Sequence, residues 1–252
     1  MALQDDDLLR EILLRLSPLP SSLPLASAVC KRWRGLVTDP RFLSSFGDHH
    51  RKEGPPTLGF FLTEFPENYP VVMFHPILDP PDSVPLSINF GRCTMLGCRH
   101  GRVLIVDGKR WELVVCAPIT GKQQRVTIPK KFKRGGFIGS VMCAARELGH
   151  VHGTCHSDHF KVILVAAYIE KTIACVYFSE TGAWGNLIST TDRPYQKFSS
   201  GCPGLLVGRT LYWLSLGDTI IEVDLEEQSI AMLTAPPGIS ITGGGAEVLH
   251  DR

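Results

Sequence analysis

The stretch that decides the fold reads Val114-Val115-Cys116-Ala117-Pro118-Ile119-Thr120-Gly121, an apolar segment that runs into a polar turn. The same pattern returns at residues 175–182 and 221–228, so that successive turns lie 61 and 46 residues apart. Repeats of roughly 40–50 residues are typical of propeller blades, each of which is a four-stranded antiparallel sheet. The repeat therefore predicts an all-β, propeller-like domain.

Other short apolar segments surround this repeat and extend the β prediction over residues 57–252. They are rich in Val, Ile, Leu, Tyr and Phe and are separated by Gly, Pro, Asp and Asn, as expected of strands and turns. The clearest segments are residues 103–106, 113–116, 125–128, 162–168, 173–178, 211–214 and 219–223. A domain of about 200 residues holds about four blades. Because residues 247–252 resemble the beginning of another strand, we expect a truncated final blade.

The first 46 residues have a helical pattern instead. Leucine and isoleucine recur at spacings of three and four along one side of a first helix, at Leu8, Leu9, Ile12, Leu13 and Leu16. The acidic residues 5–7 suit the beginning of this helix, and Pro18 and Pro20 end it. A second helix is predicted from about residue 23 to 36, with one apolar face made by Leu25, Val29, Trp33 and Leu36.

A third short helix is predicted to begin at Asp39-Pro40, a capping residue followed by proline at the first helical position. Its inward residues would be Phe42, Leu43 and Phe46. Three short helices in about 45 residues cannot hide all of their apolar side chains from water. We therefore expect another chain to bury part of this surface.

Composition excludes several classes of protein. The 252 residues are 44% hydrophobic and 20% charged with a net charge of +1, which excludes a mainly disordered chain. The longest apolar run, residues 162–169, is far shorter than the roughly 20 residues of a membrane span. No secretion signal is visible, so we expect the eight cysteines to be reduced thiols and the protein to be cytoplasmic, nuclear or both.

The helical segment closely resembles an F-box, whose pattern is Leu-Leu-x-x-Ile-Leu-x-x-Leu followed by Val-Cys-x-x-Trp. Here the first half begins at Leu8 and the second at Val29. The Leu-Pro pair typical of the start of the family's first helix is missing, with Gln4 and Asp5 near its place. The resemblance implies binding to a Skp-type adaptor, with an adaptor-binding set of Leu8, Ile12, Leu13, Leu16, Leu23, Val29, Cys30 and Trp33.

The remainder resembles the F-box-associated β-propeller-like domain of plant F-box proteins, most of all those expanded in grasses. The residues that carry this resemblance are 97–104, 117–121 and 208–214. The implied organisation is an α+β multidomain chain, with a three-helix F-box at residues 3–46, a linker at 47–56 and the β domain at 57–252. The implied function is a substrate-recruiting subunit of an SCF-type ubiquitin ligase, linked through the adaptor to cullin and RING subunits. The missing Leu-Pro pair leaves open a second interpretation, a protein-binding module that no longer engages the adaptor.

Two sharper alternatives rest on local clusters. Residues 150–159 contain four histidines and Cys155, which together with Cys143 could supply zinc ligands. No second ligand pair stands elsewhere in the sequence, so a polar loop between strands is favoured. Residues 92–136 carry eleven basic and two acidic residues, including Lys130-Lys131-Phe132-Lys133-Arg134. This excess is compatible with a solvated surface, an acidic protein partner, a nuclear import signal or, less favoured, nucleic acid.

Catalysis has little support in the sequence. The chain has no Gly-x-Ser-x-Gly elbow, no phosphate-binding loop and no His-Glu-x-x-His motif. Asp107, Glu112 and Asp224 stand where strands meet turns, which needs no catalytic explanation. The sequence predicts a binding protein rather than an enzyme, without metal or cofactor, whose target it does not identify.

Overall fold

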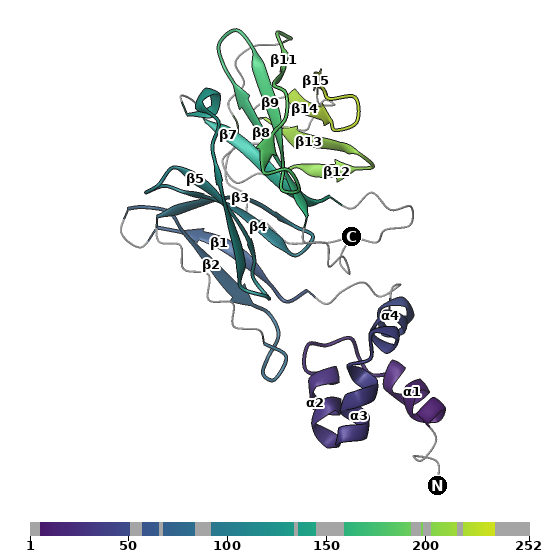
Figure 1. Cartoon of the computed structure of the whole chain (residues 1–252). Coiled ribbons are helices and arrows are strands. Elements are labelled where there is room, and N and C mark those ends of the chain that lie inside the picture. The colour runs from purple at the N-terminus through teal and green to yellow at the C-terminus, as the bar shows by residue number, and fades with distance from the viewer. Residues whose placement is uncertain are drawn as a thin grey trace. The chain divides into compact units, whose positions relative to one another are not determined.

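The computed structural model describes residues 6–50, 57–65, 68–83, 92–133, 136–144, 159–192, 198, 203–215 and 219–234. The chain divides into two compact units. One contains the N-terminal helices, and the other contains the sheets from residue 86 onward (Figure 1). The predicted combination of a helical N-terminal segment with an all-β, propeller-like domain is confirmed.

Over residues 6–50 the helical unit contains four helices, one more than the sequence predicted. They are α1 (Asp6–Leu14), α2 (Ser22–Val29), α3 (Lys31–Val37) and α4 (Pro40–His49). The single helix expected over residues 23–36 is interrupted at Cys30, whose backbone is extended with φ −164° and ψ 169°. The Cys30 carbonyl then accepts a hydrogen bond from the Arg34 N–H at 3.0 Å and so begins α3.

The interruption at Cys30 changes which side chains face the core. Ala26 from α2 and Leu36 and Val37 from α3 are buried, whereas Leu25 and Val29 are exposed. A straight helix would have placed Leu25, Val29 and Leu36 on one face, as the sequence predicted. In the structure, Ala26 of α2 and Leu36 and Val37 of α3 pack into one core. That core also contains Leu9, Leu13 and Phe42.

The expected beginning of α4 is confirmed in detail. The Asp39 carboxylate accepts a hydrogen bond from the backbone N–H of Arg41 at 3.1 Å, and Pro40 occupies the first helical position. Asp39 also pairs with Arg10 of α1 at 2.9 Å, so one aspartate caps α4 and joins it to the first helix. The backbone N–H of Arg41 lowers the pKa of Asp39 most, with further contributions from Arg10.

Between residues 92 and 234, the described part of the β domain contains three antiparallel sheets, each built from strands that are consecutive in sequence. The first sheet contains β3 (Cys93–Arg99), β4 (Arg102–Asp107), β5 (Glu112–Ala117) and β6 (Lys122–Thr127). The middle sheet contains β7 (Phe137–Cys143), β8 (Phe160–Ala167), β9 (Thr172–Phe178), β10 (Ala183–Trp184) and β11 (Ile188–Thr190). The third sheet contains β12 (Leu205–Val207), β13 (Thr210–Leu214), β14 (Thr219–Asp224) and β15 (Ser229–Thr234). A separate pair is formed by β1 (Gly59–Glu64) and β2 (Val71–Pro76).

The sequence repeat corresponds to one connection in each sheet. Its three turns join the third strand to the fourth: β5 to β6, β9 to β10 and β14 to β15. The last residue of each turn has a positive φ, as does the last residue of the β4–β5 turn, with values of 57° at Trp111, 70° at Gly121, 67° at Gly182 and 50° at Gln228. The repeat is therefore a repeated backbone geometry as well as a repeated sequence.

Two apolar cores join the three sheets. One lies between the first and middle sheets and includes Leu104, Val115 and Leu164. The other lies between the middle and third sheets and includes Ile163, Trp213 and Val223. Adjacent residues of β8 thus face different cores, which is why residues 162–167 are apolar without alternation.

Several details of the sequence prediction change or lie outside the described residues. The strand expected at residues 125–128 is β6, which begins earlier, at Lys122. The prediction missed its first residues because they are polar and exposed at the edge of the sheet. Residues 247–252, and with them the expected truncated blade, lie outside the described residues. Cys30, Cys93, Cys116 and Cys175 are free thiols, and burial raises the pKa of the Cys116 thiol to about 11. Among the described helices, none is long and apolar enough to span a membrane.

Candidate interaction surfaces

Four apolar side chains of α1 and α2 remain in contact with solvent. On α1 these are Leu8 and Ile12, which are 41% and 42% exposed and lie one turn apart on the same side of the helix. On α2 they are Leu25 and Val29, 58% and 61% exposed and likewise four residues apart. The core of the unit is filled without them. We refer to these four exposed side chains together as the helical face.

The structure divides the eight predicted adaptor-binding residues into three groups. Leu8, Ile12, Val29 and Cys30 are exposed and available to a partner. Leu13 is fully buried in the helical core. Leu16, Leu23 and Trp33 are partly buried and pack against that core.

The sequence prediction missed Leu25 and Leu43 as exposed apolar residues. Leu25 was placed on an inward face together with Leu36, and Leu43 was expected to point inward from α4. Both are exposed, at 58% and 45%. Their spacing carries no signal that separates a core residue from a docking residue, because both surfaces use the same aliphatic side chains.

Two exposed ion pairs lie on the helical unit, and one of them joins α1 to α3. Arg32 of α3 pairs with Asp6 of α1 at 2.6 Å. Arg15 and Glu11 form a pair on α1 at 2.9 Å, between positions four residues apart. Such exposed pairs contribute little stability individually.

The candidate zinc cluster falls almost entirely outside the described residues. His150, His152, Cys155 and His156 belong to that part of the chain, and His159 is described. Cys143 is buried, and its backbone N–H donates to Nδ1 of the buried His100 at 3.1 Å. In the part of the chain that the structure describes, no three potential ligands lie close enough to hold a metal ion.

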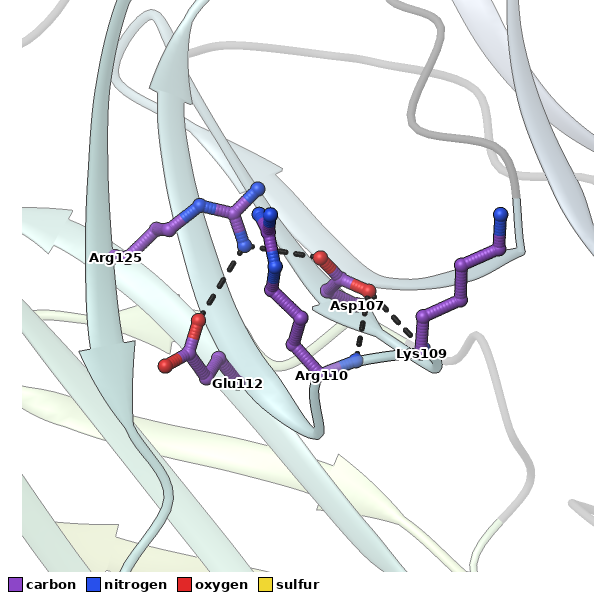
Figure 2. A network of polar contacts seen from close by, with 5 residues as sticks. All are labelled: Asp107, Lys109, Arg110, Glu112 and Arg125. Carbon is purple, nitrogen blue, oxygen red and sulfur yellow. Dashed lines mark hydrogen bonds and ion pairs between the residues drawn. The ribbon is translucent and has the colours of Figure 1, made fainter.

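Asp107 and Glu112, which stand where strands meet turns, are bound by neighbouring groups of the first sheet (Figure 2). The Asp107 carboxylate accepts hydrogen bonds from the backbone N–H groups of Lys109 and Arg110 at 3.0 and 3.2 Å, and from Arg125 at 2.9 Å. Glu112 lies 3.4 Å from the same Arg125 guanidinium. The hydrogen bond from Arg125 is the largest of the effects that lower the pKa of Asp107.

Asp224 ends β14 and precedes a four-residue turn, as Asp107 does at the end of β4. It accepts the backbone N–H groups of Glu226 and Glu227, both at 2.8 Å, and these bonds lower its pKa. Asp107 and Asp224 therefore fix turns, and their geometry is explained by that role.

Comparisons with known proteins agree with this two-part architecture. Residues 94–248 match the β-propeller family described as F-box protein AT5G49610-like, and residues 5–45 match the F-box domain. Because the first match covers more than half of the chain, the chain belongs to this family of F-box proteins with a β-propeller. The resemblance to plant F-box proteins that the sequence indicated is thereby confirmed.

A curated relative is the putative F-box protein At3g16210 of Arabidopsis thaliana. It is 26% identical over 218 residues, which are 83% of this chain and 53% of the relative. The chain thus spans about half the length of the curated relative it matches.

Proposed function

We propose that this protein is a substrate-recruiting subunit of an SCF-type ubiquitin ligase. Its helical face would bind a Skp-type adaptor and, through it, cullin and RING subunits, while the β domain would hold a target protein. F-box domains generally bind Skp-type adaptors, and proteins of these two families are typically adaptors without catalytic activity. We expect the protein in the cytoplasm, the nucleus or both, as is general for F-box proteins.

The observation that supports adaptor binding is the helical face itself. Leu8, Ile12, Leu25 and Val29 stay exposed although the helices have a complete core. Burying one aliphatic side chain contributes about 1.5–3 kcal/mol, so four of them can supply the apolar centre of a stable interface. The predicted residues Leu13, Leu16, Leu23 and Trp33 would support this face from within, and Cys30 would lie at its edge.

Co-precipitation of the full chain with a purified Skp-type adaptor tests this proposal. Ile12→Asp and Val29→Asp each place a charge in the interface, and we expect each to weaken adaptor binding at least about tenfold. Ile119→Asp is the matched control, because Ile119 is 68% exposed in the β5–β6 turn. It should bind the adaptor as the wild-type chain does.

Two results would show that the adaptor proposal is wrong. One is a wild-type chain that does not bind the adaptor, which would favour the binding module without adaptor. The other is equal binding by the wild-type chain and both aspartate variants. Circular dichroism of each variant verifies that the helices remain folded.

A further inference from the structure

We propose that one end of the first sheet is the target-binding surface of the β domain, and that it recognises an acidic protein segment. This inference rests on the proposed function, because it names the class of target that the β domain would hold. The surface, which we call the basic rim, consists of Lys109, Arg110, Trp111, Lys130, Lys131 and Lys133.

Strand register brings the two parts of the basic rim to the same end of the sheet. Asp107, the last residue of β4, is paired with Glu112 at the start of β5, and Glu112 is paired with Thr127 at the end of β6. The β4–β5 turn with residues 108–111 and the connection that follows β6 therefore leave from one edge. That connection contains the short 3-10 helix Lys130–Phe132.

Aromatic contacts fix the two parts relative to each other. The ring of Phe137, at the start of β7, lies 6.2 Å from the ring of Trp111 and 6.3 Å from the ring of Phe132, both in edge-to-face geometry. Phe132 is fully buried, so it anchors the 3-10 helix from below. In addition, the Tyr168 hydroxyl donates to the carbonyl of Lys131. These contacts therefore hold Lys130 and Lys131 in a defined position at the surface.

The charges of the basic rim are not paired with other charges in the described part of the chain. All five basic residues are exposed, and none of them forms an ion pair with the residues that the structure describes. The nearby carboxylates Asp107 and Glu112 are both engaged by Arg125. At the same end of the middle sheet, Glu170, Lys171 and Asp192 together contribute one net negative charge. A strong positive excess therefore remains on the first sheet.

Trp111 supplies an apolar anchor among these charges. Its side chain is 39% exposed and extends from the last position of the β4–β5 turn. Tryptophan and arginine are enriched among residues that dominate binding energy at protein interfaces. An acidic segment with one apolar side chain would place carboxylates on the lysines and its apolar group on the indole.

Nucleic acid fits this surface less well than an acidic protein. Single-stranded nucleic acid is commonly bound by several aromatic rings that stack on successive bases within a basic groove. The basic rim offers one exposed aromatic ring among its described residues, that of Trp111, and the neighbouring Phe132 is buried. The chain as a whole has a net charge of only +1 rather than the strong basicity of many nucleic-acid-binding domains.

Fluorescence anisotropy with three labelled probes tests the basic rim. The probes are a glutamate-rich peptide with a central leucine, the same peptide with glutamine in place of glutamate, and a single-stranded RNA of similar length. We expect the full chain to bind the glutamate peptide at least about tenfold more tightly than the other two. Binding should weaken as the salt concentration rises.

Charge-reversal variants locate the binding site on the rim. Lys109→Glu and Lys131→Glu should each weaken binding of the glutamate peptide about tenfold. Lys122→Glu is the matched control, since Lys122 begins β6 and lies about 17 Å along the strand from the rim. It should bind the peptide as the wild-type chain does.

Three outcomes would overturn the basic rim as an acidic-segment site. These are absence of peptide binding, tighter binding of the RNA, and equal losses in Lys122→Glu and Lys131→Glu. Co-precipitation of the Lys131→Glu variant with the adaptor separates this inference from the proposed function. If the wild-type chain binds the peptide but not the adaptor, the acidic-segment site stands and the ligase role is wrong. If it binds the adaptor but not the peptide, only the acidic-segment site is wrong.

Discussion

At the scale of single residues, Asp107 links a turn to an ion pair, and its ionisation should be visible in the stability of the protein. The replacement Asp107→Asn keeps an oxygen that can accept the two backbone N–H groups but removes the charge that pairs with Arg125. We expect the free energy of unfolding to fall by about 1 kcal/mol at neutral pH. Urea denaturation measures this difference.

The pH dependence of that difference follows from the lowered pKa of Asp107. A carboxylate with a depressed pKa in the folded state stabilises the protein above its unfolded value of about 3.9, and this stability is lost as the pH falls through the folded pKa. The wild-type chain and Asp107→Asn should therefore converge in stability below about pH 4. Asp224→Asn, which also precedes a four-residue turn but has no arginine hydrogen bond, should show a smaller loss. A difference that stays constant from neutral to acidic pH would contradict this account.

Neighbouring residues of α1 show how far the sequence could predict the candidate site. Ile12 and Leu13 belong to the same apolar stripe, yet Ile12 is 42% exposed and Leu13 is completely buried. The periodic pattern predicted the helix correctly. It could not tell which of the two would be exposed, because core and surface positions of this helix carry the same kind of aliphatic side chain.

At the scale of elements, the four-residue turns differ in how well their last residue suits its backbone. Gly182 has φ 67°, and a Cβ added there would meet no atom within 4 Å. Gln228 has φ 50° in the equivalent turn of the third sheet. A left-handed backbone costs a residue with a side chain about 1–2 kcal/mol. Gly182→Ala should therefore lower the free energy of unfolding by about 1 kcal/mol, and Gln228→Gly should raise it by up to about 1 kcal/mol.

Urea denaturation of both variants tests the turn geometry, with Gly136→Ala as the control. A Cβ at position 136 would meet no atom within 4 Å, and the backbone there is not left-handed. This control should change the stability by less than about 0.5 kcal/mol. The same sign of effect for Gly182→Ala and Gln228→Gly would disprove the shared geometry.

The sequence predicted strands that are buried on both faces better than strands that are exposed. The buried strands β4, β5, β8 and β9 are dense in Val, Ile and Leu, so their apolar content marked them. The edge strand β6 reads Lys-Gln-Gln-Arg-Val-Thr with one buried residue, and its sequence resembles a loop. An edge strand is defined by hydrogen bonds to its neighbour, and charged residues there discourage pairing with other chains.

At the scale of the whole β domain, the middle sheet belongs to both apolar cores. Val162 faces the core shared with the first sheet, and Val165 faces the core shared with the third. Both are completely buried and lie on the same strand. A loss of packing on either side therefore weakens the sheet on which both neighbours depend, and the three sheets should unfold together.

Val162→Ala and Val165→Ala test this coupling as a matched pair. Each removes the same two methyl groups, and we expect each to lower the free energy of unfolding by about 2 kcal/mol. Val207→Ala, at a side chain 58% exposed on β12, should change it by less than about 0.5 kcal/mol. Hydrogen exchange should increase across the first, middle and third sheets in both buried variants, because one cooperative unit opens as a whole. If Val162→Ala instead increased exchange in the first sheet alone, and Val165→Ala in the third alone, the sheets would be independent units and the shared middle sheet would not couple them.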